Sequence, residues 1–590
     1  MHPEKHLLQT KSSTIMKRFL AVTIAVLFSA TAFGQWVSPG NGTLYTMTSL
    51  STIAPTAVSS PQSGQFQIHQ NITISANDTL LLESDANDIL INNNITLTIF
   101  GALLTEPRVN HLFITGDSTG TSFFTLQLDN ASTANFSYIV FKYGQKIQLL
   151  NSGQTLFDNC VFTHFSDAVI NYMNCNPTIQ NCYFHDNQKA AITSAVNTAG
   201  SPKIINNLIQ NNDLSNANVP QINIGPGAED TIIIAGNHIE GVAQNMSGGI
   251  GIMNMGTSNT VLLVSNNVIE NNRYGYTQNG TNIYAIIQDN IIRNNNLETN
   301  PNNGGSGISI YGSTTTCGAK IRRNIIHGNL WGITAIYYHN IDMGTAEDLG
   351  ENVLYGNGNN NVEYELYNNS SCNMSAIGNY WGNNDASHAE DVIYHKPDNS
   401  SYGLVTYNPI LEIEPEFLSF SLLYDLDSNQ ELVFDISEDS DTMYATYYGG
   451  HETFFDLIRP TVEMPLGVTC SPEPDNPQNF NQPVSYTLTT PHGTSRTYVA
   501  VINFIDAVTD RETMPVTLSP NPVSGGQFTL HNESGKAISV EVHTISGQLV
   551  YKTENTGESL SVSTSNWGKG TYFVTVLQDG KRKIFKVVNP

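Results

Sequence analysis

Two acidic residues, Glu240 and Glu270, stand at the same place in two copies of a short motif, NHIEG and NNVIENN. If the copies form neighbouring strands of a parallel sheet, the two side chains lie about 5 Å apart on one side of that sheet. Carboxyl groups at that separation are compatible with retaining glycoside chemistry, so these are the candidate catalytic residues. The alternative is a solvated polar face without function, because outward positions of a sheet must be polar somewhere.

Five further residues are candidates for ligand binding. Arg293 and His327 hold the equivalent place in the next two copies, DNIIRNNN and RNIIHGN, and would extend the same column. Tyr311, Tyr337 and Tyr338 lie near the second short strand of their repeats and could stack against sugar rings. Ordinary β-propensity is the alternative for these tyrosines.

The motif that carries these residues recurs along the chain. Each copy is a short apolar piece flanked by Asn or Gly, and its second apolar residue serves as an anchor for aligning the copies. The anchors are Phe162, Phe184, Ile209, Ile239, Ile269, Ile292, Ile326, Leu354 and Trp381. They are 22 to 34 residues apart, with a mean of about 27, which is typical of a repeat architecture. Residues 137–144 form one more copy, with Phe141 as its anchor.

Each repeat contains two or three runs in which apolar residues alternate over four to six positions, which is strand periodicity. A strand this short buries its apolar side only when one coil stacks on the next. Connections between parallel strands of one sheet favour the right-handed sense. We therefore predict an all-β protein built on a right-handed parallel β-helix. The motif copies resemble the right-handed β-helix repeat family over roughly residues 66–409.

The residues beside the anchors fit this architecture. Asn tolerates the left-handed turn conformation between two faces, and stacked amides can hydrogen-bond along the axis. Cys160 and Cys182 both stand two positions before an anchor. Because side chains alternate in direction along a strand, both cysteines point inward, and we expect them to stack. We expect free buried thiols rather than a disulfide, because a disulfide needs a torsion near 90°, which in-register neighbours meet poorly.

Composition narrows the classes of partner. Charged residues make up 13% of the 590 residues, and the formal net charge is −26. A nucleic acid or an anionic membrane is not expected to bind, since either needs a concentrated basic face. Six cysteines are too few for a disulfide scaffold, and none has zinc-site spacing.

The chain starts with an export signal. A basic segment at Met16, Lys17 and Arg18 precedes an apolar run and small residues that end at Gly34. This pattern predicts a signal peptide cleaved after Gly34, with Met16 as the start of translation. The apolar run is far shorter than the ~20 residues of a membrane span, and no later segment is long enough.

The array ends in a closing segment. Residues 379–411 contain N-x-W-G, a short helical stretch and G-x-V-x-Y-x-P, and resemble the end of many β-helix proteins. The next residues hold six strand-like runs and resemble a bacterial immunoglobulin-like module. Asp425, Asp427, Asn429 and Glu431 carry spaced oxygens. They lack the glycine and terminal glutamate of a calcium loop, so we predict no cofactor or metal and leave calcium only as a possibility.

The last segment is the most specific. It contains Pro520-Asn521-Pro522, an I-S-G-Q turn at 545–548, G-T-Y at 570–572 and a basic terminal strand. These features resemble the C-terminal sorting domain of type IX secretion cargo. The resemblance implies passage across the outer membrane by the type IX machinery, then release or attachment to the cell surface. A second sandwich module without an address function is the alternative.

These observations predict five segments. They are residues 1–34 (signal peptide and upstream residues), 35–65 (N-terminal arm or cap), 66–411 (β-helix with its C-terminal cap), 412–510 (immunoglobulin-like β-sandwich) and 511–590 (sorting domain).

The functional expectation is a secreted or cell-surface monomer that binds or cleaves an extended extracellular polysaccharide. If it is an enzyme, it is a polysaccharide hydrolase or lyase; the alternative is a non-catalytic adhesin or structural surface protein. Between Asn41 and Ile410 there are only eleven Lys and Arg residues. That is too few for the dense basic groove of a uronate lyase, which must neutralise a substrate carboxylate.

Overall fold

The computed structural model describes residues 34–118, 123–241, 246–425, 430–437, 440–449, 452–505 and 514–590. The predicted signal peptide, apart from Gly34, lies outside the described residues. The chain divides into two compact units, one holding the β-helix and the other holding the C-terminal β domain.

Short strands build three long sheets, each with 14 strands within the described residues. Sheet A consists of β1 (Gln35–Val37), β5 (Asn71–Ile74), β8 (Thr96–Ile99), β11 (Phe124–Asp129), β14 (Gly144–Leu150), β17 (Ile170–Met173), β20 (Ile192–Ser194), β23 (Ile222–Ile224), β26 (Ile250–Asn254), β29 (Tyr276–Gly280), β32 (Ser306–Gly312), β35 (Trp331–Tyr337), β40 (Leu366–Ser370) and β43 (Ile393–Tyr394). Sheet B consists of β2 (Leu44–Thr46), β6 (Thr79–Leu82), β9 (Ala102–Thr105), β12 (Thr133–Ser137), β15 (Thr155–Asp158), β18 (Thr178–Gln180), β21 (Lys203–Ile205), β24 (Ile232–Ala235), β27 (Thr260–Ser265), β30 (Ile283–Gln288), β33 (Cys317–Arg322), β36 (Asn340–Asp342), β41 (Met374–Ser375) and β44 (Val405–Thr406). Sheet C consists of β3 (Val58–Gln62), β4 (Gln65–Ile68), β7 (Asp88–Ile91), β10 (Leu112–Gly116), β13 (Ile139–Lys142), β16 (Val161–Thr163), β19 (Tyr183–His185), β22 (Leu208–Gln210), β25 (His238–Glu240), β28 (Val268–Glu270), β31 (Ile291–Arg293), β34 (Ile325–His327), β37 (Val353–Tyr355) and β42 (Tyr380–Trp381).

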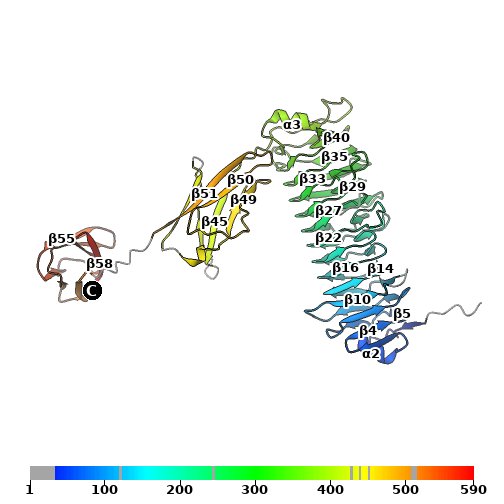
Figure 1. The fold of residues 1–590 in the computed structure, drawn as a ribbon, viewed down its shortest axis with the longest axis horizontal. Coiled ribbons are helices and arrows are strands. Elements are labelled where there is room, and N and C mark those ends of the chain that lie inside the picture. The colour runs from blue at the N-terminus through cyan, green and yellow to red at the C-terminus, as the bar shows by residue number, and fades with distance from the viewer. Residues whose placement is uncertain are drawn as a thin grey trace, which may run out of the picture. The chain divides into compact units, whose positions relative to one another are not determined.

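The chain visits the three sheets in turn, so each coil adds one strand to each sheet. The neighbours in every sheet are parallel, as β25 with β28 and β26 with β29, except for the antiparallel pair β3 and β4 at the N-terminal end. The coils stack from α2 to α3 (Figure 1). The predicted right-handed parallel β-helix is confirmed.

The predicted alignment of the coils is also confirmed. Every anchor pairs with the next one across neighbouring strands of sheet C, from Phe141 with Phe162 to Leu354 with Trp381. The rings of Phe162 and Phe184 stack with centroids 4.5 Å apart and planes 12° from parallel. The anchors fill the interior, where all of them are buried.

Asparagine has two separate structural roles in the coils. In NNVIENN, Asn266 and Asn271 adopt left-handed backbone angles, with φ of 56° and 55°, where the chain turns between faces. Asn267 and Asn272 point inward instead. The Oδ1 atom of Asn267 accepts hydrogen bonds from the backbone N–H (2.9 Å) and the side-chain amide (3.0 Å) of Asn237 in the preceding coil. Both expected uses of Asn are therefore present, at different positions.

The inward amides form two ladders along the axis, one on each side of the sheet C strands. The first ladder contains Asn207, Asn237, Asn267, Asn290, Asn324, Asn352 and Asn379. The second contains Asn187, Asn212, Gln221, Asn272, Asn295, Asn329 and Asn357, and it ends at the carboxyl group of Glu365. Because each amide both donates and accepts, polar groups are satisfied inside an otherwise apolar core.

Cys160 and Cys182 lie where the alignment of the coils predicted them. Cys160 and Cys182 are buried free thiols, and the backbone N–H of Cys160 donates to Sγ of Cys182 at 3.4 Å. Cys182 in turn donates its backbone N–H to Asn207, so the pair continues the first ladder toward the N-terminus. The expected stacking of two inward, unbonded thiols is confirmed.

Both ends of the β-helix are closed. Residues 35–65, expected as an arm or cap, contribute β1, β2 and β3 to the sheets together with helix α2 (Met47–Ile53), whose first N–H groups donate to the carboxylate of Glu83. At the other end, Trp381 is buried, helix α3 (Ala386–Val392) begins at the cap residue Asp385, and strand β44 follows. These are the closing elements that the sequence predicted.

Two smaller sheets follow the β-helix. One contains β46 (Gln430–Val433), β45 (Ser419–Asp425) and β48 (Pro460–Glu463), and the other contains β47 (Thr442–Tyr447), β51 (Ser495–Phe504), β50 (Val484–Thr489) and β49 (Thr469–Ser471). Pro465 and Gly467 lie between the end of β48 at Glu463 and the start of β49 at Thr469. Strands β47 and β51 are parallel.

The remaining short elements are the β38 (Gly358–Asn359) and β39 (Val362–Glu363) hairpin and the 3-10 helix η1 (Thr453–Phe455). Asp427 and Asn429 of the possible calcium loop lie outside the described residues. Within the described residues, no three His, Cys, Asp or Glu side chains gather closely enough to hold a metal ion.

The C-terminal β domain has its own core. Its two sheets contain β52 (Val516–Ser524), β53 (Gln527–Asn532) and β56 (Ser559–Ser563), and β55 (Leu549–Asn555), β54 (Ile538–Thr544), β57 (Gly570–Gln578) and β58 (Lys581–Asn589). Phe528, Val540 and Val574 lie in the apolar cluster between them. This domain corresponds to the segment expected to sort the protein.

The end of the second ladder predicts a pH dependence of stability. Glu365 is 1% exposed and accepts hydrogen bonds from the backbone N–H and side-chain amide of Asn357. Burial raises its pKa from the usual 4.5 to about 8. The folded protein keeps this proton up to about pH 8, whereas the unfolded chain loses it near pH 4.5. Stability should therefore fall by about 1.4 kcal/mol per pH unit between these values.

Glu365→Gln removes that titration while keeping an oxygen that accepts from Asn357. We expect the variant to gain stability over the wild type as pH rises from 5 to 8, measured by denaturant unfolding. Glu347→Gln, at an exposed carboxyl group, is the matched control and should follow the wild type. A Glu365→Gln curve parallel to the wild-type curve across this range would contradict the assignment.

Candidate functional site

The predicted polar column lies on the outer side of sheet C. Thr163, His185, Gln210, Glu240, Glu270, Arg293, His327 and Tyr355 pair in succession across neighbouring strands. Each follows a buried anchor in its strand. The structure thus brings the candidate catalytic residues Glu240 and Glu270 side by side, with Arg293 and His327 next in line.

Glu270 is held by two basic groups. Its Oε2 accepts from Nε of Arg293 at 2.7 Å, and its Oε1 lies 2.8 Å from Nε2 of His238. Burial acts to raise the pKa of Glu270, but the hydrogen bonds from Arg293 and His238 outweigh it and leave the pKa below 4.5. His238 was not among the predicted site residues, since it precedes its anchor and its reach across to Glu270 depends on the stacked coils.

Glu240 has a different environment. Its Oε2 accepts from the amide of Gln210 at 2.7 Å, and its Oε1 accepts from Asn271 at 3.4 Å. Both partners are neutral. The two carboxyl groups therefore have different hydrogen-bond partners. Glu270 is an anion at neutral pH, which excludes it as the general acid of a retaining pair but not as the nucleophile.

The far end of the column is closed by stacked rings. The rings of His327 and Tyr355 lie 4.7 Å apart and within 10° of parallel. Burial lowers the pKa of His327, and the nearby Arg293 lowers it further. A neutral imidazole packed on a phenol ring has one face covered, so His327 offers little surface for a ligand.

The three predicted tyrosines lie on another face. Tyr311 and Tyr337 belong to β32 and β35 of sheet A, and their rings meet edge to face at 5.0 Å. Tyr337 and Tyr338 are 58% and 53% exposed. The structure does not bring these tyrosines together with Glu240 and Glu270, because the two groups belong to different sheets of the coil.

Sheet A carries a larger aromatic group that sequence reasoning missed. We call it the aromatic platform, and it consists of Trp331, Tyr364, Tyr367, Tyr394 and Tyr402, each partly exposed. Trp331 lies 4.7 Å from Tyr364 and 5.1 Å from Tyr367, centroid to centroid. Tyr367 stacks on Tyr394 at 5.1 Å, and the ring of Tyr402 stands edge-on to both.

A small hollow adjoins the platform. Its volume is about 190 Å³, and its lining residues are Tyr337, Tyr338, Asn369, Ser370, Ser371, Ser401 and Tyr402. Tyr402 belongs to both features, so the predicted Tyr337 and Tyr338 and the platform form one continuous surface at the C-terminal coils.

The platform left only a weak signal in the sequence. Tyr367 and Tyr394 stand one residue after the inward Leu366 and Ile393, which marks both as outward. The motif aligned the strands of sheet C, however, and no comparable motif aligned those of sheet A. Tyr402 lies outside any strand, so only the folded chain places it against the other rings.

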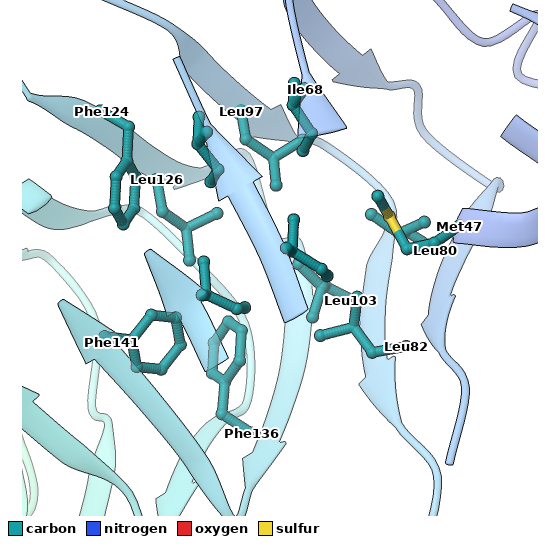
Figure 2. Close-up of a pocket in the computed structure, with 13 residues that line it drawn as sticks. Met47, Ile68, Leu80, Leu82, Leu97, Leu103, Phe124, Leu126, Phe136 and Phe141 are labelled. Atoms are coloured by element: carbon teal, nitrogen blue, oxygen red, sulfur yellow. The ribbon is translucent and has the colours of Figure 1, made fainter. Parts of the chain in front are cut away.

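The apolar cavity in the N-terminal coils is not a ligand site. It encloses only about 20 Å³, and Figure 2 shows its lining side chains converging inside the first coils. Met47, Leu103, Phe136 and the other lining residues are apolar, and such a space holds neither a ligand nor a well-bonded water.

Four family models match parts of the chain. The "right handed beta helix region" matches residues 56–213, and a "protein of unknown function" family, DUF1565, matches residues 264–387. The family "SGBP, N-terminal" matches residues 420–502, and the "secretion system C-terminal sorting domain" matches residues 517–589. Among curated proteins, none matches the chain at a significant level.

The solved structures that match parts of the chain have low sequence identity and low TM-scores. A mutant of the periplasmic alginate epimerase AlgG is 13% identical with a TM-score of 0.41, and the match covers 62% of this chain and 83% of that chain. The enzymatically active domain of tailspike protein 2 of bacteriophage CBA120 is 11% identical with a TM-score of 0.15, and the match covers 89% of this chain and 64% of that chain. At these TM-scores the similarities assign no function.

The sorting-domain match agrees with the predicted route of the protein. It covers nearly all of the C-terminal β domain, which is the segment predicted to direct export to the cell surface or the medium. None of the described helices is long and apolar enough to cross a membrane.

The contacts of Glu270 predict how its replacement changes stability. Glu270→Gln removes the negative charge that Arg293 and His238 face. The lowered pKa means that the ionised form stabilises the fold above pH 4.5, and that this contribution is lost as the pH falls through the folded-state pKa. We expect a loss of roughly 1 kcal/mol at pH 7, moderated by the exposure of Arg293, and a smaller loss at pH 3.

The matched control is Glu240→Gln, in the same column and with neutral partners. It should change the free energy of unfolding by less than Glu270→Gln at pH 7. Equal losses in the two variants, or a loss in Glu270→Gln that does not shrink in acid, would contradict the ion-pair assignment.

Proposed function

Since the chain is a right-handed parallel β-helix protein with an immunoglobulin-like module and a type IX secretion C-terminal sorting domain, we propose that it binds an extended polysaccharide outside the cell. The binding surface in this proposal is the aromatic platform with its adjoining hollow. Sorting to the cell surface or the medium brings this face into contact with extracellular glycans.

The observation that carries the proposal is the set of five partly exposed rings on one face. Aromatic rings supply large apolar area against the C–H faces of sugars, and tyrosine hydroxyls bond to sugar hydroxyls. The Oη atoms of Tyr367 and Tyr402 lie 3.3 Å apart at this surface. Ligand sites commonly combine aromatic walls with a few polar groups in this way.

Stabilisation of the sheet is the competing explanation, since cross-strand aromatic pairs strengthen sheets. The column that contains Tyr367 and Tyr394 argues against it. Upstream positions of this column are held by Thr193, Asn223, Gly251, Thr277, Ser309 and Thr334. Small and polar residues thus suffice in this column for six successive coils of the same sheet, and rings appear in it only at the last coils.

Binding without cleavage fits the geometry best. The candidate pair Glu240 and Glu270 lies on sheet C, whereas the platform lies on sheet A. Both carboxylate oxygens of Glu270 are already engaged, one by Arg293 and the other by His238. A hydrolase or lyase would instead release new reducing or unsaturated ends, and this is measurable with the same glycans.

The platform predicts which variants lose binding. We expect the full mature protein to bind at least one glycan in a panel of soluble polysaccharides. Tyr367→Ala and Tyr394→Ala should each weaken that binding about tenfold, or about 1.4 kcal/mol, because each removes a ring that stacks on the ligand. Affinity electrophoresis or calorimetry gives the dissociation constants, and product analysis on the same samples tests for cleavage.

The matched control is Tyr284→Ala, which removes a tyrosine that is 42% exposed on sheet B. Its affinity should equal that of the wild type. Unchanged binding by both platform variants would refute the proposal. Turnover that disappears in Glu270→Gln would instead assign the function to the sheet C column.

The separate cores predict the effect of removing the sorting domain. The β-helix and the C-terminal β domain each bury their own apolar cluster. Deletion of residues 518–590 should therefore leave a folded β-helix that accumulates in the periplasm, measured by cell fractionation with thermal unfolding as the control for folding. Normal amounts of the truncated protein at the surface or in the medium would contradict the sorting role.

A further inference from the structure

The surroundings of the platform are almost without positive charge. From residue 331 to residue 403 the chain contains ten Asp and Glu residues, one Lys and no Arg. Glu363, Asp391 and Asp398 are exposed, and each lies within four residues of a platform ring in the chain. The single cation of this stretch, Lys396, is exposed in the loop after β43. Of the three carboxylates, Glu363 lies 3.8 Å from His388 and Asp398 accepts from the backbone N–H of His395. The segment that carries the platform thus has a strong excess of carboxylates, which disfavours an anionic ligand on this face.

Four basic side chains in the coils around Glu270 already have acidic partners. Arg293 and His238 both contact Glu270. Arg323 pairs with Asp289, and Arg322 pairs with Asp342 and Asp348. A uronate or sulfate group that bound at one of these four cations would need to displace its acidic partner, at a cost that surface binding does not recover.

The hollow beside the platform is lined by uncharged groups. Asn369, Ser371 and Ser401 supply neutral donors and acceptors, and Tyr337, Tyr338 and Tyr402 supply ring surface. Its volume of about 190 Å³ is below the ~300–1,000 Å³ of a pocket for a drug-sized ligand. It therefore has room for one sugar unit or one substituent, and the main chain of a polysaccharide must lie outside it.

We infer that the platform selects an uncharged polysaccharide, with the chain lying across the rings and one branch or substituent seated in the hollow. This inference rests on the proposed function and adds the ligand class to it. Charge selection follows from like-charge repulsion, which rejects acidic glycans at little cost to the neutral one. The hollow adds selection for a branched or substituted chain over a plain one.

The test of charge uses one neutral polysaccharide that binds in the panel and its sulfated derivative. We expect the sulfated form to bind at least tenfold more weakly at low salt. The difference in affinity between the two forms should narrow as salt screens the repulsion. Glu363→Lys combined with Asp391→Lys should also narrow this difference in affinity. The control pair Asp85→Lys and Glu229→Lys, at exposed residues outside this stretch, should leave it unchanged.

Equal or tighter binding of the sulfated form, still abolished by Tyr394→Ala, would overturn the inference and leave the proposed function standing. Loss of all dependence on Tyr394 would refute the proposed function itself.

The test of the hollow uses Ser401→Trp, which fills it with an indole ring. We expect a branched neutral glycan to lose affinity by about tenfold and its unbranched counterpart to bind as before. Ser400→Trp, at the exposed neighbouring residue, is the matched control and should affect neither. Equal effects of Ser401→Trp on both glycans would overturn the assignment of a branch to the hollow.

Discussion

The stacking of one coil on the next is the constraint on which the rest of this protein depends. A strand of three or four residues has no stability of its own, so each coil needs a neighbour that pairs its backbone and covers its apolar side. The inward amide ladders add a second requirement. Each Asn donates to one coil and accepts from another, so a shifted coil would leave buried amide groups unpaired. Apolar stacking and amide pairing therefore demand the same alignment.

The outward-facing residues contribute little to this stacking. Because anchors, ladders and left-handed turns hold the coil together, the outward positions are under little structural demand and differ from coil to coil. On sheet C they form a series of hydrogen bonds and ion pairs, in which the carboxylate of Glu270 contacts Arg293 and His238. In the sheet A column that contains Tyr367, the six preceding coils carry small or polar residues, and rings gather only at the final coils. The uneven distribution on sheet A is what points to a ligand, since stability alone did not require rings upstream.

At Glu365 a buried carboxyl group stands in place of an amide, at the end of the second ladder. It accepts from Asn357 at the place where a further amide of the ladder would stand, and it does so as a buried carboxyl group. Both of its oxygens accept from Asn357, whereas each amide of the ladder accepts with its oxygen and donates with its nitrogen. The last coil thus closes its ladder at the cost of a dependence on pH.

Sequence alone determined the coils, their alignment on sheet C and the direction of each side chain there, because period-two alternation and the recurring Asn positions leave one arrangement that buries the anchors. It also placed Glu240, Glu270, Arg293 and His327 in one column. The tertiary structure decided what those residues touch. His238 reaches Glu270 from the neighbouring column, and Tyr402 comes from a loop, because turns of unequal length set which residues of different sheets meet. Side-chain partners across coils depend on that packing, and no local pattern in the chain encodes it.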